Sequence, residues 1–327
     1  MPAAAAEERA PAESEISMSN KATRQAFGEA LAALGESHKD IVVLDADLSK
    51  STKSELFARK FPDRFFEMGI AEANMLGTAA GLALSGKVPF CCSFAAFVTG
   101  RYDQIRISVA YSEANVKIVG THAGVAIGDD GYSQQGLEDI ALMRALPTMT
   151  VVQPADDLET AAAVKWLAEH EGPVFLRLTR QNVPRVHAEG YQFQFGKVDT
   201  LREGTDAVIF ASGGTVAPAL EAAAALEKEG ISLRVVNVHT IKPLDVEGVV
   251  AAVQASGNLA ISAEDHTVIG GLGGAIAEAL SANHPARLLR IRVQDVFGES
   301  GSPEDLLAKH GLDAAGIARQ VRAFVRG

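Results

Sequence analysis

The feature that most constrains this chain is a regular alternation of short apolar segments with amphipathic ones. Apolar segments rich in β-branched residues recur through the first 180 residues, at 41–46, 88–94, 116–122, 149–155 and 173–179. Helical periodicity lies around them, near 20–35, 71–85, 98–113, 136–146 and 156–170. Short, continuously apolar strands separated by helices are typical of a parallel sheet covered on both faces. The sequence therefore predicts the α/β class.

The alternation stops at residues 180–206 and then starts again. The interruption has no sustained period and is interpreted as a linker ending in a short hairpin. A second series of apolar segments follows at 207–212, 233–238, 259–265 and 287–293. We therefore predict two consecutive α/β domains, each with a mostly parallel sheet covered by helices. The predicted boundaries are 18–186 for the first domain, 187–205 for the linker and 206–327 for the second domain.

Residues 1–17 are rich in Ala, Glu and Ser and are predicted to form a flexible arm rather than a secretory signal. The formal net charge of −11 makes nucleic acid and anionic membranes poor candidates for partners. No apolar run approaches the ~18 residues that a membrane span needs. The adjacent Cys91 and Cys92 form neither a disulfide framework nor a metal motif, so we expect a cytoplasmic location and no metal ligands.

Polar side chains gather in the loops that follow the predicted strands of the first domain. In open α/β sheets, ligands bind at the carboxyl ends of the strands. Five loops satisfy this rule, at 45–52, 68–75, 93–97, 121–135 and 179–182. Their polar residues are Ser51, Glu72, His122, Asp129, Asp130, Gln134 and Arg180. Polar groups in five loops of one sheet edge indicate a binding site more strongly than any one of them.

Each of these residues also has a purely structural interpretation. Glu72 could be an acid that the dipole of a helix start stabilises, and His122 a hydrogen-bonded core histidine. The glycine-rich stretch at 270–275 is superficially similar to a dinucleotide-binding loop. A lone glycine run is a weak signal, and close packing of a strand on a helix is favoured there.

Several longer stretches resemble the transketolase family. They include "DADLSKST", "FEMGIAEANM", "PFCCSFAAFVTGRYDQIR" and "THAGVAIGDDGYSQQGLEDIALMRALP", followed by "LTRQN", "TIKPLD" and "AEDH". The similarity covers residues 18–325 and implies a pyrimidine-binding domain followed by a transketolase C-terminal domain. The family's diphosphate-binding motif, a GDG followed by an asparagine, has no counterpart here. The resemblance therefore implies the C-terminal subunit of a split transketolase, with a separate N-terminal subunit as its partner in an α2β2 complex.

The resemblance also implies a cofactor, thiamine diphosphate, shared between the two subunits. Glu72 matches the glutamate that faces N1′ of the aminopyrimidine, and Phe94 and Phe97 match its aromatic bed. Asp47 matches an acidic position near the cofactor and the subunit boundary. The Mg²⁺ or Ca²⁺ ion that holds the diphosphate is expected on the partner subunit.

The implied reaction is transfer of a two-carbon ketol unit from a ketose phosphate to an aldose phosphate. Asp130 matches a carboxylate that reads a substrate hydroxyl, and Gln134 stands where some members carry histidine. The positions that match the family's phosphate site are Arg24, Ser51, His122 and Arg180. The resemblance also implies that Glu72 and His122 are catalytic.

Three alternatives stay open from the sequence. The β-chain of a 2-oxoacid dehydrogenase decarboxylase component has the same layout, but has no need of a phosphate clamp. A 1-deoxyxylulose-phosphate synthase is a further relative, although it normally keeps its N-terminal module. The third alternative is a non-catalytic, transketolase-like binding protein.

Overall fold

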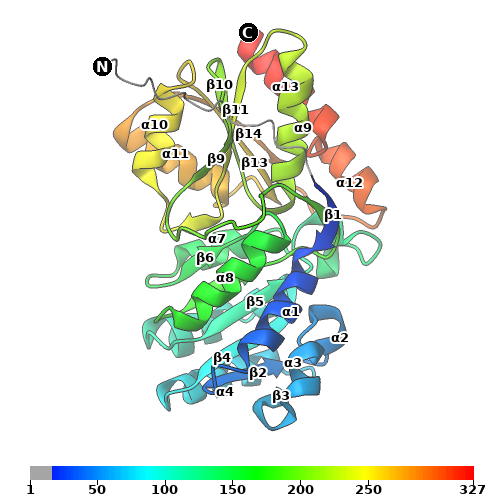
Figure 1. Ribbon diagram of the computed structural model, residues 1–327, viewed down its shortest axis with the longest axis vertical. Coiled ribbons are helices and arrows are strands. Elements are labelled where there is room, and N and C mark those ends of the chain that lie inside the picture. Colours follow the sequence, from blue (N-terminus) through cyan, green and yellow to red (C-terminus); the bar gives the residue numbers. More distant parts are fainter. Residues whose placement is uncertain (1–16) are drawn as a thin grey trace, which may run out of the picture.

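The computed structural model describes residues 17–327 and contains two sheets stacked along the long axis of the molecule (Figure 1). The predicted arm therefore lies outside the described residues, except for Ser17. The first domain carries a seven-stranded sheet and the second a five-stranded sheet, each with helices on both faces. The predicted α/β class with two consecutive, mostly parallel sheets is confirmed.

The sheet of the first domain has the order β12-β6-β7-β5-β4-β2-β3. All its strand pairs are parallel except β12 with β6. Its strands are β2 (Ile41–Asp45), β3 (Phe65–Glu67), β4 (Val88–Phe94), β5 (Lys117–Thr121), β6 (Thr150–Val152), β7 (Val174–Arg177) and β12 (Thr240–Lys242). The five apolar segments of the sequence became the five central strands.

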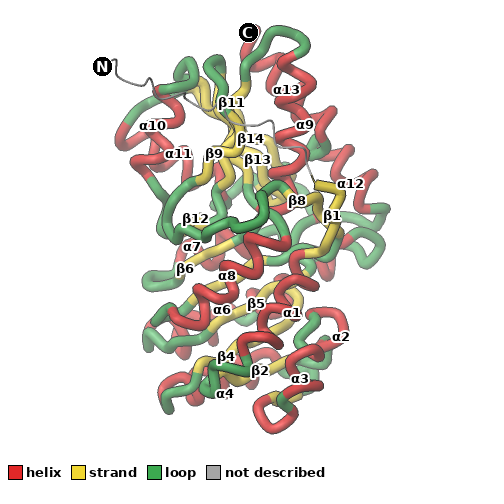
Figure 2. The backbone as a smooth tube through the Cα atoms, viewed as in Figure 1, coloured by secondary structure: helices red, strands yellow, loops and turns green. Residues whose placement is uncertain are grey.

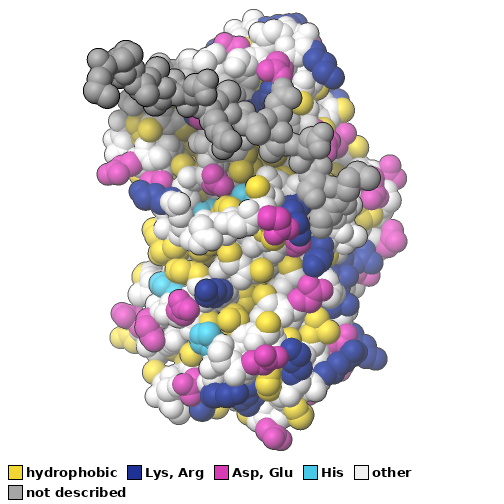
Figure 3. Space-filling model, in the orientation of Figure 1, with side chains coloured by type: hydrophobic (Ala, Val, Ile, Leu, Met, Phe, Trp, Pro, Cys, Tyr) yellow, Lys and Arg dark blue, Asp and Glu magenta, His cyan; other side chains and the backbone are white. Residues whose placement is uncertain are grey.

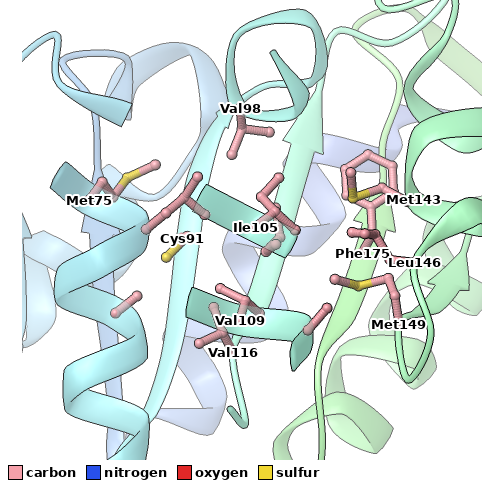
Figure 4. Close-up of a cluster of buried hydrophobic side chains, with 14 of the residues drawn as sticks. Met75, Cys91, Val98, Ile105, Val109, Val116, Met143, Leu146, Met149 and Phe175 are labelled. Carbon is pink, nitrogen blue, oxygen red and sulfur yellow. The ribbon is translucent and has the colours of Figure 1, made fainter. Parts of the chain in front are cut away.

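Alternate residues of these strands enter two separate cores, because successive side chains of a strand point to opposite faces. On one face, Leu44, Cys91 and Ile118 pack against the helical segments α4 (Glu72–Leu84), α5 (Ala95–Thr99), α6 (Tyr102–Gln104), Ile105–Tyr111 and α7 (Asp139–Ala145). Figure 4 shows Met75 of α4 and Ile105 and Val109 beside Cys91 in this core. The other face packs against α1 (Thr23–Leu34), α3 (Glu55–Lys60) and α8 (Asp157–Glu169). A continuously apolar strand is thus explained by burial on both sides.

The second domain repeats this arrangement with the strand order β14-β13-β10-β11-β9. Its strands are β9 (Asp199–Arg202), β10 (Ala207–Ala211), β11 (Leu233–Asn237), β13 (Leu259–Thr267) and β14 (Arg287–Val293). One face is covered by α9 (Val216–Glu227), α12 (Pro303–His310) and α13 (Ala314–Arg326), and the other by α10 (Val246–Gln254) and α11 (Leu272–Asn283). Among residues 17–327, no helix has the length and apolar character that crossing a membrane requires.

Short strands at the edges depart from the sequence-based expectation. The hairpin predicted at the end of the linker does not form, because β8 (Asn182–Arg185) pairs with β1 (Ser17–Ala22) and β9 pairs with β11. Figure 2 shows β8 beside β1, and β12 near β6, close to the level at which the two domains meet. The predicted helix at 98–113 is also divided, with a π-helical segment over Ile105–Tyr111. The four-residue helix α2 (Ser49–Thr52) is a further short element.

A buried polar cluster joins the two domains at the N-terminal end of α8. Asp156, the N-cap of α8, accepts hydrogen bonds from the backbone and the Nδ1 atom of His187, each at 2.9 Å. The His187 Nε2 atom lies 3.3 Å from an Asp199 carboxylate oxygen. Glu159 accepts from the Asn237 amide of β11 and from the Tyr191 hydroxyl. Burial disfavours the charged imidazole, but Asp156, Asp199 and Glu159 together raise the pKa of His187 to about 10.

Because of this cluster, we expect the stability of the folded chain to fall as the pH becomes alkaline. The folded pKa of His187 lies above the ~6.5 of an unfolded histidine, so its contribution is complete below pH ~6.5. That contribution is lost as pH rises through about 10. We expect the thermal midpoint of the wild-type chain to fall over this range, and the fall to be much smaller in His187→Gln. His38→Gln changes a half-buried histidine outside this cluster and is the control. The same pH dependence in wild type and His187→Gln would refute the assignment.

Candidate functional site at the carboxyl edge of the first sheet

The five loops singled out in the sequence leave the same edge of the first sheet. Strands β3, β2, β4, β5 and β7 are neighbours in that order and run parallel, so their carboxyl ends lie together. This edge carries Asp47 after β2, Glu72 after β3, Phe94 at the end of β4, His122 after β5 and Arg180 after β7. The space between these loops is the candidate site.

Glu72 is the first residue of α4 and is only 5% exposed. Within residues 17–327 its carboxylate forms no hydrogen bond or ion pair. The apolar residues next to Glu72 in the sequence are Met68, Ile70 and Met75. Met75 is fully buried below the helix, but Ile70 is 82% exposed and Met68 is half-buried. The apolar enclosure is therefore incomplete in this chain, and a buried carboxyl without a partner is available for a ligand.

A flat aromatic surface lies at the ends of β4 and β5. The rings of Phe94 and Phe97 are nearly parallel, at 13° with centroids 5.4 Å apart. The imidazole of His122 stacks on Phe94 at 3.8 Å. His122 also has a φ of 59°, a left-handed backbone that side-chain-bearing residues adopt rarely. The chain thus holds a stacking surface for a planar ring.

Positive charge accumulates next to these rings without a balancing acid. The Arg24 guanidinium donates to the Ser51 carbonyl oxygen at 2.6 Å and lies 3.1 Å from His122 Nε2. Arg180 donates to the Ile127 carbonyl at 2.6 Å. Among the described residues, Arg24, Arg180 and the neighbouring Lys53 form no ion pair, and Arg24 Nε is buried without a hydrogen bond. An anion with several oxygens would satisfy these donors.

The electrostatics of this cluster fix the state of His122. Burial, followed by the charges of Arg24, Arg180 and Lys53, lowers the pKa of His122 to about 3. Burial and the charge of Arg180 also lower the pKa of Arg24. A guanidinium can only donate, so Nε2 of the neutral imidazole accepts from Arg24. Nδ1 then carries the proton and donates to the Thr121 hydroxyl at 2.8 Å.

Three other predicted residues lie at the surface and form no contact with this cluster. Asp130 is exposed, and Gln134 is half-buried in a 3₁₀ turn over Tyr132–Gln134. Asp47 is also exposed, and its backbone N–H donates to Glu67 at 2.7 Å. The side chains of Asp47, Asp130 and Gln134 are therefore free to meet a ligand or a partner chain.

Sequence reasoning missed Lys53 and Asp45. Lys53 follows α2 with a left-handed φ of 70°, which turns the chain toward the cluster. Asp45 ends β2 and is fully buried, where it accepts from Leu48 N–H and from the hydroxyls of Thr52 and Ser54. Burial raises the pKa of Asp45 to about 6. For Asp45, the one signal available in the sequence was an acid at the end of the apolar segment 41–44.

Comparison with known proteins identifies the fold family. Residues 19–186 match the family "Transketolase, pyrimidine binding domain". The chain belongs to the transketolase family. Residues 196–317 match "Transketolase, C-terminal domain", so the two sheets correspond to two consecutive transketolase domains.

Individual relatives of this transketolase-family chain point to the C-terminal section. A split-gene transketolase, solved as an inactive β4 tetramer, superposes with a TM-score of 0.87 at 49% identity, covering 94% of this chain and 99% of that one. A protein of Methanocaldococcus jannaschii with the provisional name of a transketolase C-terminal section is 45% identical over 92% of this chain and 95% of its own. Human transketolase is 40% identical over 93% of this chain. The matched region covers only 49% of the human protein, so this chain spans about half of its length.

The residues of the site fit the cofactor of the family. Transketolases use thiamine diphosphate and a divalent metal. The aminopyrimidine is a planar ring with a basic nitrogen, and the chain offers two parallel phenyl rings and a partnerless carboxyl group. In the part of the chain from residue 17 onward, no group of three or more His, Cys, Asp or Glu side chains is placed to hold a metal ion.

Proposed function

We propose that this chain is the C-terminal subunit of a split transketolase that transfers a two-carbon ketol unit from a ketose phosphate to an aldose phosphate. A separate N-terminal subunit would add the diphosphate and the Mg²⁺ or Ca²⁺ site. The observation that carries the proposal is the pairing, at one sheet edge, of a partnerless buried Glu72 with an acid-free cluster of cations.

In this proposal, Glu72, Phe94 and Phe97 hold the aminopyrimidine half of thiamine diphosphate, and Asp47 lies at the boundary with the partner. When bound, thiamine diphosphate supplies the nucleophilic carbon to which the ketol unit is transferred. The carboxyl of Glu72 shares a proton with N1′ of the pyrimidine, and the two phenyl rings keep that ring in its plane. Offset aromatic contacts of this kind contribute about 0.5–1.5 kcal/mol beyond burial.

The cationic cluster would bind the phosphate of the sugar. Arg24 and Arg180 supply planar donors, Lys53 adds charge, and Ser51 adds a hydroxyl. Neutral His122 adds no charge, and its ring fills the space between Arg24 and Phe94. Asp130 and Gln134, from the exposed turn, would reach the hydroxyl groups of the sugar. A 2-oxoacid carries no phosphate, so the cluster favours ketol transfer over a 2-oxoacid decarboxylase.

The exposed side of α4 is the surface on which we expect the assembly to form. Ala73, Gly77 and Gly81 are exposed at successive turns of this helix, between the exposed apolar residues Ile70 and Leu84. Small residues at this spacing let another backbone approach closely. Partner chains at this surface would cover Ile70 and close the environment of Glu72, in an α2β2 complex. The similar split-gene protein, whose tetramer contains β chains alone, is inactive.

On the face drawn in Figure 3, acidic and basic side chains are interspersed, which gives no reason to add a nucleic acid as a partner. Both cysteines, Cys91 and Cys92, are buried free thiols. They agree with the cytoplasmic location that we propose for the enzyme.

Reconstitution tests the proposal. The chain is mixed with its N-terminal subunit, thiamine diphosphate and Mg²⁺, and transfer between xylulose 5-phosphate and ribose 5-phosphate is followed. We expect activity from the mixture and none from either subunit alone. Full activity of this chain alone would contradict the split-subunit assignment. Release of CO₂ from a 2-oxoacid, without ketol transfer, would replace the proposed function by the alternative.

A further inference from the structure

None of the predicted site residues lies in the second domain. Residues of that domain nevertheless form hydrogen bonds to the loop of the first domain that carries His122. Asp265, near the end of β13, is 7% exposed and directs both carboxylate oxygens into this loop. Oδ1 accepts from the Val125 N–H at 2.9 Å, and Oδ2 accepts from the Ala126 N–H at 3.3 Å. Residues 140 positions apart in the sequence are thus joined by a buried carboxyl group at the domain boundary.

Further contacts fix the same loop from the second domain. The Thr267 N–H donates to the Leu137 carbonyl at 2.8 Å, and the Gln135 side chain donates to the Glu299 carbonyl at 2.9 Å. Gly124 has a φ of 84°, and a Cβ atom there would lie 2.0 Å from Asp265 Oδ2. The loop therefore approaches Asp265 so closely that only glycine fits at position 124.

The turn that Asp265 holds is also the one that orients Arg180. Val125–Ile127 forms a single 3₁₀ turn, in which Asp265 receives the first two N–H groups. The carbonyl of the third residue, Ile127, accepts the hydrogen bond from Arg180 at 2.6 Å. A shift of this turn would move the Ile127 carbonyl, and with it the Arg180 guanidinium that donates to this carbonyl, away from Arg24 and Lys53.

We propose that Asp265 is a positioning residue for the phosphate subsite, acting through the 125–127 turn on Arg180. This inference rests on the proposed function, because it takes the Arg24–Arg180 cluster as the place where phosphate binds. It assigns a role to the second domain, which carries none of the predicted site residues. Asp265→Asn should loosen the turn, since an amide accepts one N–H but presents its own NH₂ group to the other.

The affinity for inorganic phosphate tests the inference without any need for activity. It is measured on the full chain from the phosphate-dependent rise of the thermal midpoint. We expect Asp265→Asn to weaken phosphate binding about tenfold, as loss of one well-oriented charged hydrogen bond would. Glu221→Gln removes an exposed acid of the same domain and is the matched control. In the reconstituted enzyme, Asp265→Asn should raise the KM for phosphorylated sugars with little change in kcat.

The outcomes separate this inference from the proposed function. If Arg180→Ala fails to weaken phosphate binding, the phosphate site itself is wrong. If Arg180→Ala weakens it and a folded Asp265→Asn does not, Asp265 has only a structural role and the inference fails. The wild-type chain gives an answer even if Asp265→Asn does not fold. Its Val125 and Ala126 amides should exchange with solvent as slowly as those of β13, and rapid exchange would overturn the inference.

Discussion

Glu72→Gln is expected to lower the turnover of the reconstituted enzyme by about a thousandfold, within the ~10²–10⁴ that proton transfer by a positioned side chain contributes. Glutamine has the size of glutamate and fits the same place at the start of α4. It cannot share a proton with the pyrimidine nitrogen. Because Glu72 has no hydrogen-bonded partner among the described residues, the substitution should leave the isolated chain folded. Initial rates at saturating substrate and the thermal midpoint measure the two effects.

A purely structural role for Glu72 makes the opposite prediction. A first-turn acid that only complements the helix dipole would lose about 0.3–1 kcal/mol of stability on neutralisation and leave turnover unchanged. Glu55→Gln is the matched control, because Glu55 stands in the first turn of α3 and pairs with Arg59. Normal turnover of Glu72→Gln in a complex that binds thiamine diphosphate would exclude the catalytic assignment.

The central part of each sheet could be predicted from the sequence because its signal is local. Strands β2 and β4 are apolar at nearly every position and β5 is buried along its whole length, since both faces of these strands are covered. The segments predicted at 41–46, 88–94 and 116–122 agree with them to within a residue. Continuously apolar strands are typical of a parallel sheet, so the sequence also predicted the parallel arrangement. The edge at which the candidate site lies followed from that arrangement.

The short strands β8, β9 and β12 could not be predicted, because their partners are distant in the sequence. Strands β8 and β9 have four residues each, and β12 has three. β12 comes from the chain beyond β11 yet completes the sheet of the first domain. Such short strands have no clear period, and tertiary contacts decide their pairing.

In the candidate site, too, some residues have a local signal in the sequence and others are placed only by tertiary contacts. Glu72, His122 and Arg180 could be picked out by their place after strands, and the family resemblance supplied their roles. Lys53 and Asp265 could not, because each acts through a contact that only the folded chain creates. An isolated lysine or aspartate in a sequence gives no indication of which loop it will approach. The absence of a balancing acid around Arg24 is likewise a property of the assembled cluster.

Arg177→Leu is the substitution with the largest expected effect on stability. Arg177 is 1% exposed, and its Nε donates to Asp139 at 2.7 Å. Its Nη2 donates to the carbonyls of Gly136 and Asp265, which lie in different domains. Burial disfavours the charge, yet Asp139 and the nearby acids raise the pKa of Arg177 above its ordinary value. The guanidinium therefore stays charged, and it offsets the burial of Asp139.

Removing Arg177 leaves the Asp139 carboxylate buried without its countercharge, which in other proteins costs about 3–5 kcal/mol. Urea unfolding of the isolated chain should show a loss of this size for Arg177→Leu. Arg59→Leu removes an exposed arginine from a surface pair and should change stability by less than about 1 kcal/mol. The double variant Asp139→Leu/Arg177→Leu removes the Asp139 charge as well, so part of the loss should be recovered. If the double variant recovers none of the loss, the stranded Asp139 charge does not cause it, and the two carbonyls that Arg177 joins dominate its contribution.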